Sequence, residues 1–120
     1  GFDRDPNMIR MAEANAKRAG VDQFILFRQA DVANLSNPAS GRQPVVVTNP
    51  PYAERLGELK ALEGTYRELG DTLKQKFKGS SCYILSGRPE LTKFISLNST
   101  RKRAVSNGAI DCRFLRYDIN

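Results

Sequence analysis

The chain has 120 residues, 40% of them hydrophobic, which suits one compact domain or part of one and is too polar for a membrane protein. No stretch approaches the ~18 consecutive apolar residues of a membrane span, and the charged opening, Gly1-Phe2-Asp3-Arg4-Asp5, is not a secretory signal, so we expect a cytoplasmic protein without a membrane partner. The formal net charge is +6 and histidine is absent, which excludes histidine-based nucleophilic catalysis and the usual zinc ligand sets within the chain, so we expect no metal site.

The first predicted elements are a helix and a strand. Asp5 and Pro6 have the chemistry of an N-cap and a first helical residue, and apolar residues then recur at helical spacing until Gly20. Residues 24–27, Phe-Ile-Leu-Phe, are an apolar run of strand formers and predict a buried strand that ends near residues 29–30. A polar loop follows.

The rest of the chain alternates strands with helices. Val45–Thr48 is β-branched throughout, as in a parallel strand buried on both faces, and two prolines end it. Apolar residues at three- and four-residue steps predict a long amphipathic helix over residues 59–77, somewhat weakened by Gly64 and Gly70. A buried strand over residues 82–85, a helix starting at Pro89 and a hairpin around Asn107-Gly108 complete the series.

This order predicts an α/β fold. Helix, strand, helix, strand, helix and hairpin favour a sheet of parallel strands with right-handed crossovers, finished by an antiparallel edge. Cys82 and Cys112 each lie in an apolar run, so we expect packed, reduced thiols rather than a disulfide.

Polar residues end three of the strands expected from the pattern, and ligands bind beyond the carboxyl ends of strands in open α/β sheets. These residues are Asp3, Asp31 and Asn49. A carboxylate is a pure acceptor, so Asp3 suits a pair of ribose hydroxyls and Asp31 suits an adenine amino group. The alternative for either acid is a turn or cap residue.

The tetrapeptide Asn49-Pro50-Pro51-Tyr52 is the strongest chemical signal. The Asn49 side-chain oxygen and the Pro50 carbonyl can both accept hydrogen bonds from an aromatic amine and orient its nitrogen toward an electrophilic methyl group. The prolines stiffen the corner, and Tyr52 offers a face on which a base can stack. A target base would have to be flipped or single-stranded. The alternative is a tight turn with Tyr52 packed on the core.

The motif resembles the amino-methyltransferase signature of class I S-adenosyl-L-methionine enzymes, which methylate adenine N6, guanine N2 or glutamine N5. The run from Asn49 to Gly57, the opening Asp3-Arg4-Asp5-Pro6, the Ala30-Asp31-Val32 triplet and the final Asn107-Gly108-Ala109-Ile110-Asp111-Cys112 narrow the resemblance. They are similar to the THUMP-associated guanine-N2 methyltransferases of 23S ribosomal RNA.

The resemblance covers essentially the whole chain and implies a Rossmann-like sheet of order 3-2-1-4-5-7-6. It implies that Asp3 holds the cofactor ribose and Asp31 the cofactor adenine. Asn49, Pro50, Pro51 and Tyr52 would hold the guanine, with Asn49 also beside the cofactor.

One departure from the family concerns the start of the chain. Nothing before Gly1 supplies the first strand and the Gly-rich loop that cradle the methionine end of the cofactor. We therefore expect residues 1–120 to be the C-terminal part of one methyltransferase catalytic domain. An N-terminal remainder would complete the sheet, and the chain alone would be inactive and bind cofactor weakly.

Ribosomal RNA is the expected partner. Seven basic residues lie between Arg88 and Arg116 against two acidic ones, Glu90 and Asp111. Phosphate contacts are expected from Arg88, Arg101, Lys102 and Arg103, with a simple charged edge as the alternative. Arg55 is expected to contact RNA, and Glu54 and Arg55 are equally suited to RNA positioning and to a solvated helix entry. A glutamine-N5 methyltransferase and a non-catalytic RNA-binding remnant remain alternatives.

Overall fold

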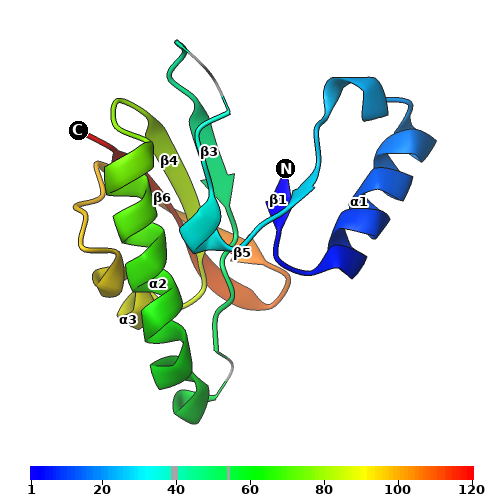
Figure 1. The fold of residues 1–120 in the computed structure, drawn as a ribbon. Helices are drawn as coiled ribbons and strands as arrows, with labels where there is room; N and C mark the ends of the chain where they lie inside the picture. Colours follow the sequence, from blue (N-terminus) through cyan, green and yellow to red (C-terminus); the bar gives the residue numbers. More distant parts are fainter. Residues whose placement is uncertain (39–40, 54) are drawn as a thin grey trace. The chain divides into compact units, whose positions relative to one another are not determined.

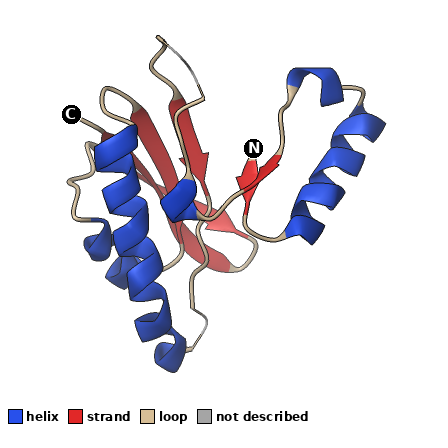
Figure 2. Cartoon of the chain, in the orientation of Figure 1, coloured by secondary structure: helices blue, strands red, loops and turns tan. Residues whose placement is uncertain are grey.

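The computed structural model describes residues 1–38, 41–53 and 55–120 (Figures 1 and 2). The chain divides into two compact units, Gly1–Leu35 and Ser36–Asn120. Within the described residues, no helix has the length and apolar character needed to cross a membrane.

The first unit contains a two-stranded parallel sheet and one long helix. Strand β1 (Phe2–Asp3) pairs with β2 (Arg28–Gln29), and α1 (Pro6–Ala19) connects them together with the 3-10 turn η1 (Asp22–Phe24). A second turn, η2 (Val32–Asn34), follows β2. The predicted helix is confirmed at both ends. The Asp5 carboxylate accepts a hydrogen bond from the Asn7 amide at 2.8 Å, and Gly20 closes the helix in the left-handed conformation at φ 71°.

The prediction of a buried strand over residues 24–27 is wrong. Phe24 closes η1, and only Arg28 and Gln29 pair with β1, because β1 itself is two residues long. Phe24 and Leu26 are 80% and 64% exposed. The apolar run therefore leads into the strand instead of forming it.

The second unit is a four-stranded sheet covered on one face by helices. It comprises β3 (Val45–Thr48), α2 (Leu56–Lys76), β4 (Ser81–Ser86), α3 (Pro89–Thr92), η3 (Lys93–Ile95), β5 (Arg101–Asn107) and β6 (Ile110–Asp118). The strand order is β3-β4-β6-β5, with β3 and β4 parallel and the other neighbours antiparallel. Figure 1 shows α2 along one face of this sheet. The α/β class, the long helix and the C-terminal hairpin are confirmed.

The core of the second unit lies between α2, the α3–η3 segment and the sheet. Its fully buried side chains are Tyr66, Leu73, Cys82, Ile84, Leu91, Ile95 and Ile119. Cys82 and Cys112 are buried free thiols, as predicted. Gly70 brings α2 directly against η3, since a β-carbon at this position would lie 2.1 Å from the Ile95 carbonyl oxygen.

Strand β3 is an edge strand of this sheet. Val45 and Val47 are 65% and 68% exposed, so the prediction that the strand is buried on both faces is wrong. Val46 and Thr48, which alternate with them, are half-buried. In the described residues the β-branched run thus packs on one face only.

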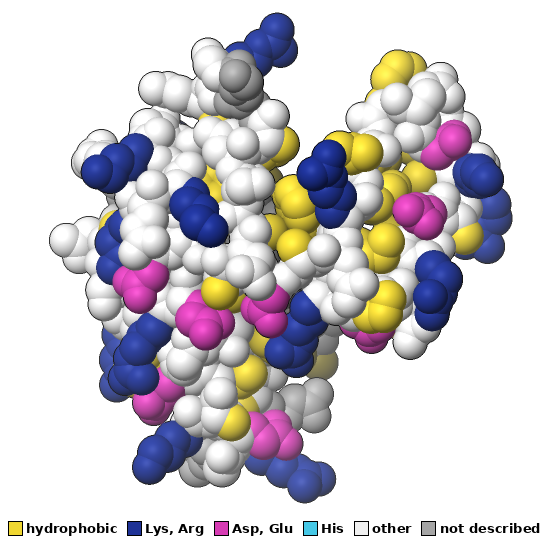
Figure 3. Space-filling view, viewed as in Figure 1, with side chains coloured by type: hydrophobic (Ala, Val, Ile, Leu, Met, Phe, Trp, Pro, Cys, Tyr) yellow, Lys and Arg dark blue, Asp and Glu magenta, His cyan; other side chains and the backbone are white. Residues whose placement is uncertain are grey.

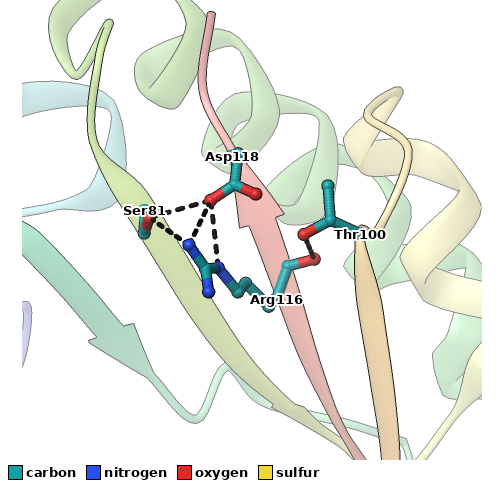
Figure 4. A network of polar contacts seen from close by, with 4 residues as sticks. All are labelled: Ser81, Thr100, Arg116 and Asp118. Atoms are coloured by element: carbon teal, nitrogen blue, oxygen red, sulfur yellow. Dashed lines mark hydrogen bonds and ion pairs between the residues drawn. The ribbon is translucent and has the colours of Figure 1, made fainter.

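A polar network joins β4, β6 and β5 where β4 begins (Figure 4). The Asp118 carboxylate accepts hydrogen bonds from the Ser81 hydroxyl at 2.8 Å and from Arg116 Nε at 3.0 Å, and the Thr100 hydroxyl donates to the Arg116 carbonyl at 3.3 Å. The Ser81 hydroxyl, with Thr100 and Arg116, lowers the pKa of the Asp118 carboxyl. The network pins the register of the antiparallel strands at the end remote from the carboxyl end of β3.

Candidate active site

The Asn49-Pro50-Pro51-Tyr52 segment leaves the carboxyl end of β3 and runs toward α2 (Figure 1). Asn49 is exposed, Pro50 is buried and Tyr52 is half-buried. The buried proline anchors the corner, so the asparagine amide is displayed to solvent. Such an arrangement leaves the amide available to a ligand, while Tyr52 is partly packed, as the tight-turn alternative expects.

Tyr66 fixes the segment from the α2 side. Its hydroxyl donates a hydrogen bond of 2.9 Å to the Pro51 carbonyl oxygen, and the residue is completely buried. Burial raises the pKa of the Tyr66 phenol from 10.0 to about 12, so the hydroxyl keeps its proton and remains a donor at neutral pH.

Arg88 fixes the segment from the β4 side. Its Nε donates to the Ala53 carbonyl oxygen at 2.8 Å. The turn that carries Arg88 is itself held by Ser86, whose hydroxyl accepts from the Arg88 amide at 3.3 Å and donates to the Arg88 carbonyl at 3.2 Å. The carbonyl groups on either side of Tyr52 are therefore both tied down.

Gly87 packs flat against Tyr52. A β-carbon on Gly87 would lie 3.2–3.3 Å from three ring carbons of Tyr52, which is tighter than ordinary contact. Glycine lets the backbone of the β4–α3 turn support the tyrosine ring, and any larger residue would push the ring away.

These residues form one wall of a pocket of about 440 Å³. Its lining residues are Tyr52, Ala53, Gly87, Arg88, Pro89, Glu90 and Ile110. The volume lies within the roughly 300–1,000 Å³ of small-molecule sites. A half-buried aromatic face beside an arginine and a glutamate suits a flat ligand that carries hydrogen-bonding groups. A purine base fits that description.

Asp3 and Asp31 lie at the carboxyl end of the two strands of the first unit's sheet. Asp3 ends β1, and the Ala30 amide donates to the Asp3 carbonyl at 3.0 Å, which brings the residue before Asp31 alongside it. The Asp3 carboxylate accepts from the Asp5 amide at 2.8 Å, and Asp31 precedes η2 without a side-chain cap bond. The structure thus brings the two acids close together at the carboxyl ends of β1 and β2. The contact between Asp3 and the Asp5 amide also fits the alternative role of Asp3 as a turn residue.

The predicted RNA-contacting residues are dispersed. Arg88 belongs to the motif pocket, and the exposed Arg55 is the residue before α2. Glu54 lies outside the described residues. Arg101, Lys102 and Arg103 are exposed on the edge strand β5, where side chains alternate between faces, so the three do not form one cluster.

The surface over α2 carries both signs of charge. Figure 3 shows basic and acidic side chains interspersed there, and Arg67 and Lys74 pair with Glu63 and Asp71 at 3.8 and 3.1 Å. Such a face does not attract a polyanion strongly. Within the described part of the chain, no group of acidic and cysteine side chains is arranged to hold a metal ion.

Sequence reasoning missed Tyr66, Ser86 and Gly87. The helical spacing identified Tyr66 as an inward-facing residue, but spacing along a helix carries no information about which carbonyl a buried hydroxyl will reach. Gly87 follows a strand and precedes an Arg-Pro pair, a pattern that marks a turn without revealing the ring packed against it.

The profile of the family described as "RMKL-like, methyltransferase domain" matches residues 1–116. The ribosomal RNA large subunit methyltransferase K/L of Vibrio campbellii is 40% identical over 119 residues, covering 99% of this chain and 17% of that protein. The same-named protein of Syntrophotalea carbinolica is 40% identical over 121 residues, again covering 99% and 17%. The chain thus spans about a sixth of the length of these relatives.

Solved structures agree on the fold. A possible methylase from Clostridium difficile 630 superposes with a TM-score of 0.90 at 29% identity, over 100% of this chain and 31% of that one. SMU.472 complexed with SAH gives 0.89 at 27% identity, with the same coverage. A predicted N6-adenine-specific DNA methylase from Listeria monocytogenes gives 0.83 at 32% identity, over 100% and 30%.

Proposed function

The chain belongs to the RMKL-like methyltransferase domain family of S-adenosyl-L-methionine-dependent enzymes, and from that premise we propose that it methylates the exocyclic N2 amine of a guanine in large-subunit ribosomal RNA, in the cytoplasm. The observation that carries the proposal is the Asn49-Pro50-Pro51-Tyr52 corner, in which Asn49 is exposed and Tyr52 lines a pocket of about 440 Å³. The names of the relatives support an RNA substrate.

The chain's own residues orient the amine. The Asn49 side-chain oxygen and the Pro50 carbonyl accept its two hydrogens, while the Tyr52 ring stacks on the base. Tyr66 and Arg88 keep both acceptors and ring in place by holding the Pro51 and Ala53 carbonyls. This orientation removes rotational freedom of the nucleophile before the reaction, a contribution that does not require a general base.

S-adenosyl-L-methionine supplies the electrophilic methyl group. The residues proposed to hold it are Asp3, through the ribose hydroxyls, and Asp31, through the adenine amino group, with Asn49 beside the reacting end. The two carboxylates lie at the carboxyl edge of the β1–β2 sheet, where acceptor-only groups suit those donors.

We propose further that residues 1–120 are the C-terminal part of one catalytic domain. The orders β2-β1 and β3-β4-β6-β5 correspond to 3-2 and 4-5-7-6 in the class I sheet of order 3-2-1-4-5-7-6. We propose that the strand of position 1 lies outside residues 1–120. Calorimetry tests this: the chain alone should bind S-adenosyl-L-methionine weakly or not at all, and a chain extended to include that strand should bind tightly. Tight binding by the 120 residues alone would contradict it.

The test of function is Asn49→Ala in an enzyme that contains residues 1–120. We expect methylation of ribosomal RNA to fall at least 100-fold while cofactor affinity falls much less, because the amide orients the acceptor in the transition state. The matched control is Asn15→Ala, at an exposed asparagine of α1, which should leave the rate unchanged. Undiminished methylation by the Asn49 variant would refute the mechanism.

The product identifies the substrate. Nucleoside mass spectrometry should detect N2-methylguanine in RNA. N6-methyladenine would instead match the activity named for the Listeria neighbour. Methylglutamine in a protein substrate would indicate the glutamine-N5 reaction, and salt-sensitive RNA binding without cofactor binding would indicate a non-catalytic remnant.

A further inference from the structure

A second, smaller pocket lies next to the proposed base pocket. It has a volume of about 250 Å³, and Pro89 lines both. Its other lining residues come from the end of β4, the α3–η3 segment with the loop after it, and the β5–β6 pair: Ser86, Thr92, Lys93, Leu97, Asn98, Ser99, Lys102, Arg113, Leu115 and Tyr117. This volume falls below the roughly 300–1,000 Å³ of small-molecule sites, so the pocket suits a small group rather than a whole nucleoside.

The charge of this pocket is entirely positive. Lys93, Lys102 and Arg113 line it, and none of the described residues that line it is acidic. In the described ranges none of these three cations forms an ion pair. Lys93 Nζ lies 5.2 Å from the centre of the Phe94 ring, a contact that leaves its charge uncompensated. Three cations around one small hollow attract an anion.

The strand register explains why these cations converge. Lys102 pairs with the buried Leu115, so both side chains lie on the face that the helices cover, and Ala104 pairs with Arg113 on that same face. Arg101 and Arg103 pair with Arg116 and Phe114 on the opposite face. Alternation along β5 therefore places Lys102 on the opposite face from Arg101 and Arg103, and of the three only Lys102 lies on the face that carries Arg113.

The hydroxyl groups that line the pocket differ in whether they already have a hydrogen-bond partner. Ser86 is engaged with the Arg88 backbone, and the Thr92 hydroxyl donates to the Pro89 carbonyl at 2.9 Å. Tyr117 is 3% exposed, and its hydroxyl makes no hydrogen bond within the part of the chain that the structure describes. Burial raises the pKa of Tyr117 to about 12, so it stays a donor at neutral pH.

We propose that this pocket binds a backbone phosphate of the RNA adjacent to the methylated base, held by Lys93, Lys102 and Arg113. The proposal rests on the proposed function, because the base must occupy the neighbouring pocket. Pro89 lines both pockets, so we place the base on its Tyr52 side and a neighbouring phosphate of the same RNA strand on its other side. The site fixes the backbone and therefore positions the base without reading sequence.

The experiment measures the binding of short RNA substrates in which single phosphates near the target guanine are replaced by neutral methylphosphonates. In the wild-type enzyme, replacement of one phosphate should lower affinity on the order of tenfold, as expected for hydrogen bonds to a charged group. In the Lys102→Gln, Arg113→Gln double variant the same replacement should cost almost nothing further. The log–log salt slope of RNA binding should become shallower by about one in this variant, because one phosphate is no longer neutralised by the protein.

The control is the Arg101→Gln, Arg103→Gln double variant, which removes the same charge from the β5–β6 hairpin but from its opposite face. It should weaken RNA binding through the overall field yet keep the full penalty for the methylphosphonate. An equal methylphosphonate penalty in wild type and in Lys102→Gln, Arg113→Gln at every position would overturn the proposal. Competition by inorganic phosphate that depends on Lys102 and Arg113, without any coupled RNA position, would also overturn it by assigning a free anion.

Failure of the proposed function appears in a different measurement. Product nucleosides and cofactor binding are measured on the wild-type enzyme in the same preparation. If the wild type forms N2-methylguanine and no coupled phosphate exists, only the phosphate site is refuted. If the wild type does not bind RNA, both proposals are refuted.

Discussion

Two glycines of α2 predict opposite responses to the same substitution. Gly64 is exposed and a β-carbon there would meet nothing within 4 Å, whereas a β-carbon on Gly70 would lie 2.1 Å from the Ile95 carbonyl oxygen and 2.8 Å from its carbon. Alanine is favoured over glycine in a helix by about 0.5–1 kcal/mol at both positions. The intrinsic gain is therefore equal, and only the surroundings differ.

At Gly70 the collision dominates. The contacting atoms are backbone atoms of η3, so no side chain can rotate away, and the distance of 2.1 Å has to lengthen to at least 3.4 Å before the contact becomes ordinary. Ile95 and Leu91 are fully buried, so this movement disturbs the core between α2 and the α3–η3 segment. Overpacking of this kind costs about 1–3 kcal/mol and sometimes more. We expect Gly64→Ala to raise the free energy of unfolding by about 0.5–1 kcal/mol and Gly70→Ala to lower it by about 0.5–2 kcal/mol, which is the overpacking cost less the helix gain.

The assay is thermal and urea unfolding, with hydrogen exchange of α2 and η3 amides to locate the change. One kcal/mol corresponds to a shift in the midpoint temperature of about 2–8 °C, depending on domain size. Faster exchange should be confined to α2, η3 and their neighbours in the Gly70 variant. Equal midpoints for the two variants would refute the packing argument.

Removing the Tyr66 hydroxyl by Tyr66→Phe should reduce kcat on the order of tenfold with unchanged cofactor affinity, because the Pro51 carbonyl loses this donor and the motif loosens. Steady-state kinetics with Tyr83→Phe as control measures the effect. Equal kcat values for the two variants would contradict it. The free energy of unfolding should decline as pH rises above about 9. Burial raises the pKa of Cys82 from 9.0, and of Tyr66 and Tyr117 from 10.0, to about 12 in the folded protein. Unfolding therefore releases protons from pH 9 upward, and the stabilisation is lost between the unfolded pKa values and the folded ones. Chemical unfolding at pH 8 to 11, followed by circular dichroism, measures it, and a flat profile across that range would contradict it.

Signals confined to neighbouring residues predicted their structures well. Asp5, Pro6 and Gly20 fixed the limits of α1, and Asn107-Gly108 located the β5–β6 turn, because capping and turn formation depend on a few adjacent residues. The apolar run at residues 24–27 failed for the converse reason. A short apolar run does not indicate which residues will pair, and that is decided by β1, more than twenty residues earlier.

The same distinction between contiguous and distant residues applies to the candidate site. The Asn49-to-Tyr52 motif could be recognised because its chemistry is contiguous. The contacts that hold it could not be predicted, since Tyr66 reaches back fifteen residues and Arg88 thirty-five. The basic residues of β5 could be predicted in part. Once the segment is known to be extended, alternation along the strand separates Lys102 from Arg101 and Arg103. The neighbour of Lys102, Arg113, follows only from the register of the hairpin.

The two groups of site residues depend on separate parts of the fold. Tyr66, Arg88 and Gly87, which hold the motif, all belong to the second unit, and the β1–β2 edge that carries Asp3 and Asp31 belongs to the first. The residues proposed to face the base are therefore held by contacts within the second unit, and the acids proposed to hold the cofactor belong to the first. It follows that substitutions around Tyr52 should alter turnover while cofactor affinity is retained, and that substitutions of Asp3 or Asp31 should do the reverse. A Tyr66 variant whose only defect was weaker cofactor binding would show that this separation does not exist.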